Sequence, residues 1–393
     1  MSRGLEDSPD RLITRNLILV SVAAFVFFAA FHVLVPVLPL FVQAIGGGAT
    51  DIGLAVGSFT ISSFTIRLFV GPRLDTRGRR GVLLGGMVAF AVGMALLMLA
   101  NSVLAVFFVR IFQGIGWGAT NTALNTLIAD MAPPNRRGEA MGVFGAVLNV
   151  AMAIGPAAGL ALTVTTGFLG VFVIATCLSV VAVLASLPVV ETRKQARGAA
   201  QAPELSGLNR FFNREALQPS ATMFLVALTF GAMMPFLPVY AGAETVGIFY
   251  VVYAVTLLAS RPITGRMSDL YGRKVVLAPS IGVAAAGVFA LSLSNELAAV
   301  LATAVLYGVG FGAVFPTLSA LTVDLCAVSQ RGTAMATLTA AFDMGVAVGS
   351  MLFGVVIDMA SYQAGFVGAA LVGLMGLVYF VATAPTPRRI QPE

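Results

Sequence analysis

Five ionisable side chains lie inside long apolar stretches of the chain, where an uncompensated charge is costly: His32, Arg67, Arg110, Arg261 and Asp343. Charged groups surrounded by hydrocarbon are rare, and those that occur pair with one another, bind substrates or relay protons. Asp343 is the only acid among the five. These side chains are therefore the first candidates for chemistry.

Asp343 is predicted to exchange protons or to bind a cation. It lies about eleven residues into the apolar stretch 332–357, close to its middle. Desolvation favours the protonated carboxyl group, whereas a nearby guanidinium favours the carboxylate. The protonation state would therefore change as the surroundings open to one side or the other. The alternative is a static ion pair or a hydrogen-bonded acid.

His32 and Arg110 are predicted to support this proton exchange. At 1.5 Å per helical residue, each lies roughly 10–12 Å below the outer end of its apolar stretch. The two side chains are therefore expected to share one polar pocket. For His32, the alternative is a hydrogen-bonded packing residue.

The composition excludes a water-soluble domain. Hydrophobic residues make up 58% of the 393 residues and charged residues 10%, which leaves too little polar surface for solubility. Twelve stretches are long enough to cross a roughly 30 Å hydrocarbon core, and helices satisfy their own backbone there. The predicted fold is an all-α integral membrane protein. Its predicted helices are 16–40, 52–72, 81–100, 103–129, 138–163, 167–188, 217–240, 245–266, 275–294, 297–322, 332–357 and 363–384.

The distribution of Lys and Arg predicts the orientation. Of the 23 basic residues, three lie inside apolar stretches, and the other 20 lie in the termini and in alternate loops. Positively charged loops face the cytoplasm, so both termini are predicted to be cytoplasmic in an inner (plasma) membrane. The net charge of +6 then reflects topology and gives no reason to expect a nucleic-acid partner. No residue spacing indicates a metal or another cofactor.

The two halves of the chain repeat at an offset of 194 residues. An offset kept over about 100 residues indicates a six-helix unit duplicated in the same orientation. The polar stretch 191–216 between the copies is predicted to be a cytoplasmic linker, which gives an N-terminal bundle 1–190 and a C-terminal bundle 217–393. The matched pairs include Arg67 with Arg261, Asp75 with Asp269, Arg79 with Arg273, Asp130 with Asp324 and Gly155 with Gly349.

Four motifs narrow the family. The loop Gly71-Pro-Arg-Leu-Asp75-Thr-Arg-Gly78-Arg79-Arg80 recurs at 265–274 and resembles the signature between helices 2 and 3 of the major facilitator superfamily. With the other three motifs, it resembles the twelve-helix drug/proton antiporter branch. The chain departs from that branch at Thr76, where a basic residue is usual, and it has no acid in its first helix. The other motifs are Pro36-Val-Leu-Pro39, Arg110-Ile-Phe-Gln113-Gly114-Ile-Gly116 and Gly155-Pro156-Ala-Ala-Gly159.

The resemblance implies the major facilitator fold of two pseudo-symmetric six-helix bundles, a part for Arg110 in proton transfer, and export. The repeated loop is expected to form a gate, in which an acid meets a helix N-terminus and Arg79 reaches Asp130. Gly155 and Pro156 are expected to form a bend or a tight packing point. The predicted gating residues are Asp75, Arg79, Asp130, Arg67, Arg261, Asp269, Arg273, Gly155 and Pro156.

Two stripes are predicted to line the substrate site. Residues one turn apart on helix 103–129 are mostly polar, and their repeat partners on helix 297–322 are mostly aromatic. Such walls suit an amphipathic, partly aromatic or cationic solute, although an aromatic stripe can also be packing. The predicted substrate-binding residues are Gln113, Trp117, Asn121, Asn125, Asn149, Tyr307, Phe311 and Phe315.

The sequence thus predicts a monomeric secondary active transporter that exports amphipathic small molecules in exchange for protons by alternating access among membrane lipids. One alternative is export of a hydrophilic metabolite such as a sugar or siderophore, because Arg110 and His32 would bind carboxylates. Another is an uncoupled sensor-like or lipid-handling homologue. No nucleophile–base pair or metal cluster in the sequence points to an enzyme.

Overall fold

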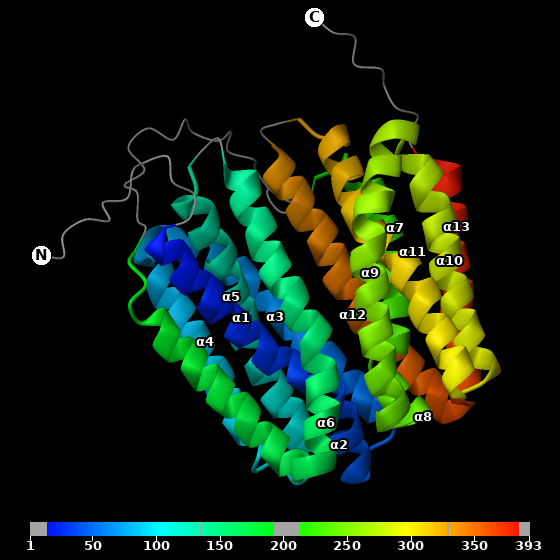
Figure 1. The fold of residues 1–393 in the computed structure, drawn as a ribbon, viewed down its shortest axis with the longest axis horizontal. Coiled ribbons are helices and arrows are strands. Elements are labelled where there is room, and N and C mark those ends of the chain that lie inside the picture. Colours follow the sequence, from blue (N-terminus) through cyan, green and yellow to red (C-terminus); the bar gives the residue numbers. More distant parts are fainter. Residues whose placement is uncertain (1–13, 134–135, 192–212, 328–329, 385–393) are drawn as a thin grey trace, which may run out of the picture. The chain divides into compact units, whose positions relative to one another are not determined.

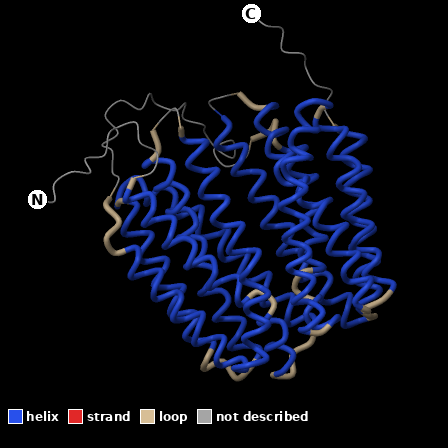
Figure 2. The backbone as a smooth tube through the Cα atoms, in the orientation of Figure 1, coloured by secondary structure: helices blue, strands red, loops and turns tan. Residues whose placement is uncertain are grey.

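The computed structural model describes residues 14–133, 136–191, 213–327 and 330–384. Within these ranges every regular element is a helix (Figures 1 and 2), as the apolar composition predicts. The helices are α1 (Arg15–Leu34), α2 (Val37–Ala44), α3 (Ala49–Arg77), α4 (Arg79–Leu97), α5 (Val103–Met131), α6 (Arg137–Ser186), α7 (Leu217–Met233), α8 (Leu237–Ala241), α9 (Ala243–Tyr271), α10 (Arg273–Leu293), α11 (Leu297–Leu325), α12 (Arg331–Met359) and α13 (Tyr362–Thr383).

The described part of the chain has eleven helical stretches that are long and apolar enough to cross a membrane, one fewer than predicted. The difference arises in α6, which runs for 50 residues and contains the predicted helices 138–163 and 167–188. A continuous helix of that length would measure about 75 Å, more than twice the hydrocarbon thickness. Gly167 interrupts it with φ 69° and ψ −178°, and the ribbon turns back there (Figure 1). With α6 counted as two stretches, the twelfth predicted segment is accounted for.

Proline breaks two of the predicted helices. The predicted helix 16–40 is divided into α1 and α2 around Pro36, and the predicted helix 217–240 is divided into α7 and α8 around Pro235. Proline lacks the amide donor that a helix interior needs, so the helical hydrogen bonds stop at these points. In both places a second proline follows three residues later, at Pro39 and Pro238.

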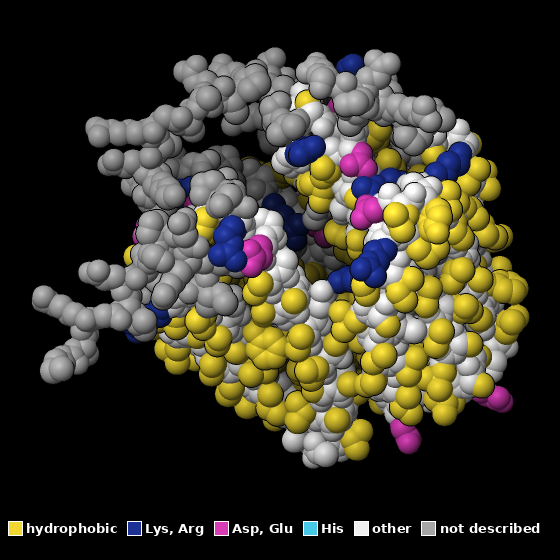
Figure 3. Space-filling model, turned by 45° about the horizontal axis from the view of Figure 1, so that its top comes forward, with side chains coloured by type: hydrophobic (Ala, Val, Ile, Leu, Met, Phe, Trp, Pro, Cys, Tyr) yellow, Lys and Arg dark blue, Asp and Glu magenta, His cyan; other side chains and the backbone are white. Residues whose placement is uncertain are grey.

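The chain divides into two compact units, 1–198 with 235–251 and 199–234 with 252–393. Most of the predicted linker 191–216 lies outside the described residues, so the predicted bundle boundaries remain a prediction. In Figure 3, hydrophobic side chains cover the flanks of the helices. In each unit the basic residues of the repeated loop lie at one end of the helices, where α3 meets α4 in the first unit and α9 meets α10 in the second. We refer to this end as the basic end of that unit.

Three glycines two residues apart let α5 pack backbone to backbone against two other helices. A Cβ on Gly114 would lie 2.3 Å from the Phe59 carbonyl oxygen of α3, and one on Gly118 would lie 2.3 Å from that of Ser63. A Cβ on Gly116 would lie 2.6 Å from the Phe90 nitrogen of α4. Helices in a membrane associate mainly through such close contact. These glycines therefore set the positions of α3, α4 and α5.

The same glycine pattern recurs in the second unit. A Cβ on Gly308 would meet Thr256 of α9 at 2.7 Å, and one on Gly310 would meet Ala284 of α10 at 2.6 Å. The predicted repeat thus preserves both the spacing of the glycines and the helices that they face.

We expect Gly116→Ala to destabilise the first unit. The added Cβ would meet backbone atoms of α4, which cannot rotate away. The free energy of unfolding should therefore fall by about 1–3 kcal/mol, and the melting temperature in detergent should fall with it. Gly145→Ala in α6 is the matched control, because a Cβ there meets nothing within 4 Å. Equal melting temperatures for the two variants would contradict this account of the packing.

Candidate functional site

An ion pair connects the start of α4 to the end of α5 at the basic end of the first unit. Arg79 Nε donates to Asp130 Oδ2 at 2.9 Å. The two side chains are 15% and 26% exposed, so water screens the pair only in part. The predicted contact between Arg79 and Asp130 is therefore present. The predicted position of Asp75 cannot be compared, since the side chains of residues 71–77 lie outside the described ones.

Glu191, which the sequence interpretation did not single out, closes the N-terminus of α4. Its Oε1 accepts from the Arg79 backbone N–H at 2.9 Å, and its Oε2 accepts from that of Arg80 at 3.0 Å. Both amides lie in the first turn, where no helical carbonyl is available, and the helix dipole favours a negative charge. Gly78 precedes this turn with φ 92°, and a Cβ on it would lie 2.6 Å from Glu191 Oε2. A carboxylate directly after an apolar helix, facing basic loops, was the available sequence signal.

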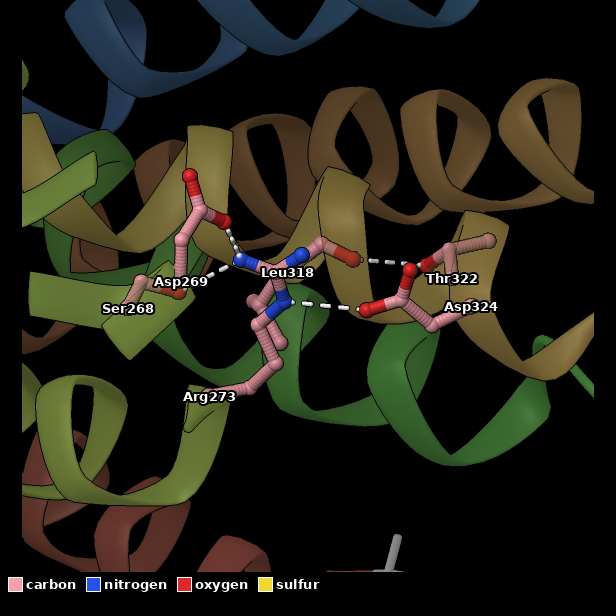
Figure 4. A network of polar contacts seen from close by, with 6 residues as sticks. All are labelled: Ser268, Asp269, Arg273, Leu318, Thr322 and Asp324. Atoms are coloured by element: carbon pink, nitrogen blue, oxygen red, sulfur yellow. Dashed lines mark hydrogen bonds and ion pairs between the residues drawn. The ribbon is translucent and has the colours of Figure 1, made fainter. Parts of the chain in front are cut away.

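The second unit has a more open version of the ion pair (Figure 4). Arg273 Nε donates to Asp324 Oδ2 at 2.9 Å, and its Nη1 donates to Asp269 Oδ1 at 2.5 Å and to Ser268 Oγ at 2.9 Å. Asp324 is 51% exposed and Asp269 is 70% exposed. The guanidinium therefore joins α9, α10 and α11, but each carboxylate remains largely hydrated.

A basic residue of each unit also caps the last carbonyl groups of another helix. Arg80 Nη2 donates to the Leu187 carbonyl at 2.7 Å, and Lys274 Nζ donates to the Val381 carbonyl at 3.0 Å. All four residues obey the offset of 194. Cations are favourable at helix C-termini, so the repeated loop holds α6 and α13 in equivalent ways.

The predicted gating residues within the membrane have different surroundings. Arg67 and Arg261 are half-buried at equivalent positions of α3 and α9. A Cβ on Gly155 would lie 2.5 Å from His32 Cβ, so the segment that contains Pro156 packs closely against α1. The repeat partner Gly349 approaches the Leu228 carbonyl of α7 equally closely, at 2.5 Å. Close packing is thus common to both units, and a gating role for these residues remains a prediction.

His32 and Arg110 contact different groups. His32 Nδ1 lies 2.8 Å from the Phe28 carbonyl oxygen. The centre of its ring lies 5.2 Å from that of Phe31, in an edge-on arrangement. The Phe31 ring stacks on the Phe59 ring, with their centres 5.2 Å apart. Arg110 Cζ lies 3.9 Å from the centre of the Phe59 ring. A series of contacts through Phe31 and Phe59 therefore links the two side chains, and the shared polar pocket remains a prediction.

The stripe on α5 divides into two parts. Gln113 is fully buried and accepts from Arg110 Nη1 at 2.8 Å, and Trp117 packs among aromatic rings, with Phe31 at 4.1 Å. Asn121 and Asn125 are half-buried, and Asn125 Nδ2 donates to Asn121 Oδ1 at 2.7 Å. The half of the stripe near Arg110 is thus packed, and the half toward the basic end offers polar groups.

The stripe on α11 belongs to an aromatic cluster of the second unit. The Tyr307 and Thr229 hydroxyls are 2.9 Å apart, and Tyr307 stacks on Phe311 at 5.3 Å. Phe342 of α12 lies 5.8 Å from Phe315 and 6.3 Å from Phe311. Asp343 follows Phe342 directly and is half-buried, as is its repeat partner Asn149 in α6. Asp343 therefore lies in α12, one residue after the Phe342 that contacts this cluster.

A polar cluster fastens the chain where α7 begins. Asn213 Oδ1 accepts from the Glu215 and Ala216 backbone amides at 2.8 and 3.2 Å, and Asn213 Nδ2 donates to Gln330 Oε1 at 2.9 Å. Burial, together with the Glu215 carboxylate, raises the pKa of the Cys326 thiol, which therefore stays protonated at neutral pH and donates to Asn213 Oδ1 at 3.6 Å. This cluster ties α7 to the segment between α11 and α12.

These features define a class of protein. The chain is a multi-pass helical membrane protein with a duplicated arrangement of glycine contacts and ion pairs, and five ionisable side chains lie inside its apolar stretches. A model of the Major Facilitator Superfamily matches residues 20–248 and 220–393, which together span nearly the whole chain. The chain belongs to this superfamily and is a membrane transporter rather than an enzyme.

Relatives extend this assignment. An MFS-type transporter of Methanocaldococcus jannaschii is 23% identical over 359 residues, which cover 88% of this chain and 92% of the relative. The quinolone resistance protein NorA of Staphylococcus aureus is 26% identical over 135 residues, 34% of this chain and 35% of NorA. A mutant of the nucleoside transporter NupG has the same fold, with a TM-score of 0.77, 15% identity and coverage of 94% and 100% of the two chains. The human organic anion transporter MFSD10 also has this fold, with a TM-score of 0.65 and 18% identity, and the match covers 95% of this chain and 100% of MFSD10.

We expect Glu191→Gln to lower the melting temperature in detergent. The neutral amide lacks the negative charge that interacts with the N-terminus of α4. Its absence should lower the free energy of unfolding by about 0.5–2 kcal/mol. Glu139→Gln is the control, because that carboxylate is exposed and pairs only with Arg136 three residues away. A larger effect at Glu139 would rule out the capping role.

The ion pairs at the basic ends of the two units should differ in strength. Asp130→Asn should lower the free energy of unfolding by about 1 kcal/mol. Asp324→Asn should lower it less, because its ion pair is more hydrated and Arg273 still pairs with Asp269. Chemical or thermal unfolding of both variants in detergent measures the difference. The reverse order would show that exposure does not govern these pairs.

Proposed function

We propose that this transporter exports amphipathic small molecules in exchange for protons, with Asp343 as the proton-binding group. The observation that supports the proposal is the position of this carboxyl group. Among the described residues, Asp343 is the only acid in the middle of a membrane helix, and it is half-buried next to Phe342. A charged carboxylate is costly in hydrocarbon, and the uptake of a proton would remove that cost.

The aromatic cluster of the second unit supplies the other half of the proposed site. The ring centres of Phe230, Phe311 and Phe342 are 5.2 to 6.3 Å apart. These residues come from α7, α11 and α12, respectively. Aromatic faces attract cations and apolar solutes, and the adjacent carboxylate adds a charge. Protonation of Asp343 would remove that charge and release a cationic solute. Proton uptake and solute release would thereby be coupled.

The remaining predicted residues have supporting parts in this proposal. Asn121, Asn125 and Asn149 would offer hydrogen bonds to the solute, and the Arg79 and Arg273 ion pairs would hold one conformation closed. Arg110 and His32 would influence proton affinity through their charge. The protein would act as a monomer in the inner membrane with cytoplasmic termini. The similarity to part of NorA supports drug export, because that relative is a quinolone resistance protein.

We expect Asp343→Asn to abolish transport driven by a pH gradient, because the amide cannot take up a proton in the same range. Liposomes that contain the protein and an internal pH dye would report proton movement when a lipophilic cation is added. Asp358→Asn, at the C-terminal end of α12, is the matched control and should transport normally. Unchanged proton flux in Asp343→Asn at every pH would overturn the assignment.

A further inference from the structure

Arg110 is a buried cation that pairs with no carboxylate of the described side chains. Its side chain is 4% exposed in the first unit. Nε donates to the Ala55 carbonyl of α3 at 3.3 Å, and Nη1 donates to Gln113 Oε1 at 2.8 Å. Nη2 makes no hydrogen bond to the described residues. Neutral acceptors and one aromatic face thus surround a full positive charge.

The described carboxylates of residues 14–191 have partners elsewhere. Asp51 Oδ2 accepts from the Gly48 amide at 2.9 Å at the start of α3, and Asp130 binds Arg79. Glu139 binds Arg136, and Glu191 caps α4. The Asp75 side chain is outside the described part, but residue 75 lies near the basic end, whereas Arg110 lies in the opposite half of α5. The charge of Arg110 is therefore not neutralised by a described carboxylate of these helices.

A buried charge without a counter-ion is strongly unfavourable, and an anion that enters its surroundings removes much of that cost. Guanidinium groups bind carboxylates through paired hydrogen bonds, for which Nη2 is available. The Phe59 ring faces Arg110 and packs against Phe31 and Trp117, and this cluster offers a surface to an aromatic solute. Because Arg110 is nearly enclosed, these side chains must move aside when a ligand binds.

We propose that Arg110 binds the carboxylate of an aromatic solute, with Gln113 holding the guanidinium in position. The proposal names a substrate class and rests on the proposed export function for its role in transport. Binding itself does not depend on proton coupling, because Asp343 belongs to the other unit.

The position of Trp117 gives a direct measurement. It is the only tryptophan of the chain and lies two helical turns from Arg110, with Phe31 at 4.1 Å. Purified protein in detergent would be titrated with benzoate, with the neutral isostere benzamide and with chloride while tryptophan fluorescence is followed. We expect a saturable change with benzoate, and no saturable change with benzamide or chloride.

Variants locate the site. Arg110→Gln should weaken benzoate binding about tenfold or more, since charge-assisted hydrogen bonds are lost. Arg110→Lys, which keeps the charge but not the planar fork, should bind with an intermediate affinity and serves if the first variant does not fold. Arg136→Gln changes an exposed arginine and should bind like the unchanged protein.

The outcomes separate the two proposals. Benzoate binding that Asp343→Asn retains and Arg110→Gln loses supports the carboxylate site whether or not transport is coupled to protons. Equal responses to benzoate and benzamide, a response to chloride alone, or full benzoate binding in Arg110→Gln would each overturn it. Loss of binding at Arg110 leaves the proton role of Asp343 standing.

Discussion

The fold depends on close backbone contact at a few glycines. In hydrocarbon there is no hydrophobic drive to bring helices together, so association rests on van der Waals contact and on a few polar bonds. Gly114, Gly116 and Gly118 allow α5 to touch α3 and α4 along its length. That contact brings Asp130, at one end of α5, to Arg79, and it sets Arg110, nearer the other end, against Ala55. The polar contacts of the first unit therefore follow from its packing.

The repeat preserves structure and varies chemistry. Glycines, the ion-pair residues and the pair Arg67 and Arg261 keep the offset of 194, whereas Arg110 and Asp343 do not. Arg110 corresponds to Ala304, and Asp343 corresponds to Asn149. The two halves are thus similar scaffolds that differ in an interior Arg110 on one side of the repeat and an interior Asp343 on the other. The positions where the two copies disagree are the ones that carry the proposed functions.

Most of the fold could be predicted from the sequence, because apolar length and charge position directly reflect the membrane. Twelve stretches, the repeat and the contact between Arg79 and Asp130 all came from such patterns. The break at Pro36 and the reversal at Gly167 were less accessible, since proline and glycine also occur inside membrane helices. The site was predicted less fully. Spacing placed His32 and Arg110 at one depth, but it could not show that His32 contacts Phe31 and that Arg110 contacts Phe59.

The chain is fastened on both sides of the segment between the units. Glu191 binds backbone amides of α4 within the first unit, and Asn213 binds Gln330 and Thr337 within the second. Each of these contacts lies within one unit and involves described residues on either side of 192–212. The covalent connection between the units guarantees equal amounts of the two unlike halves.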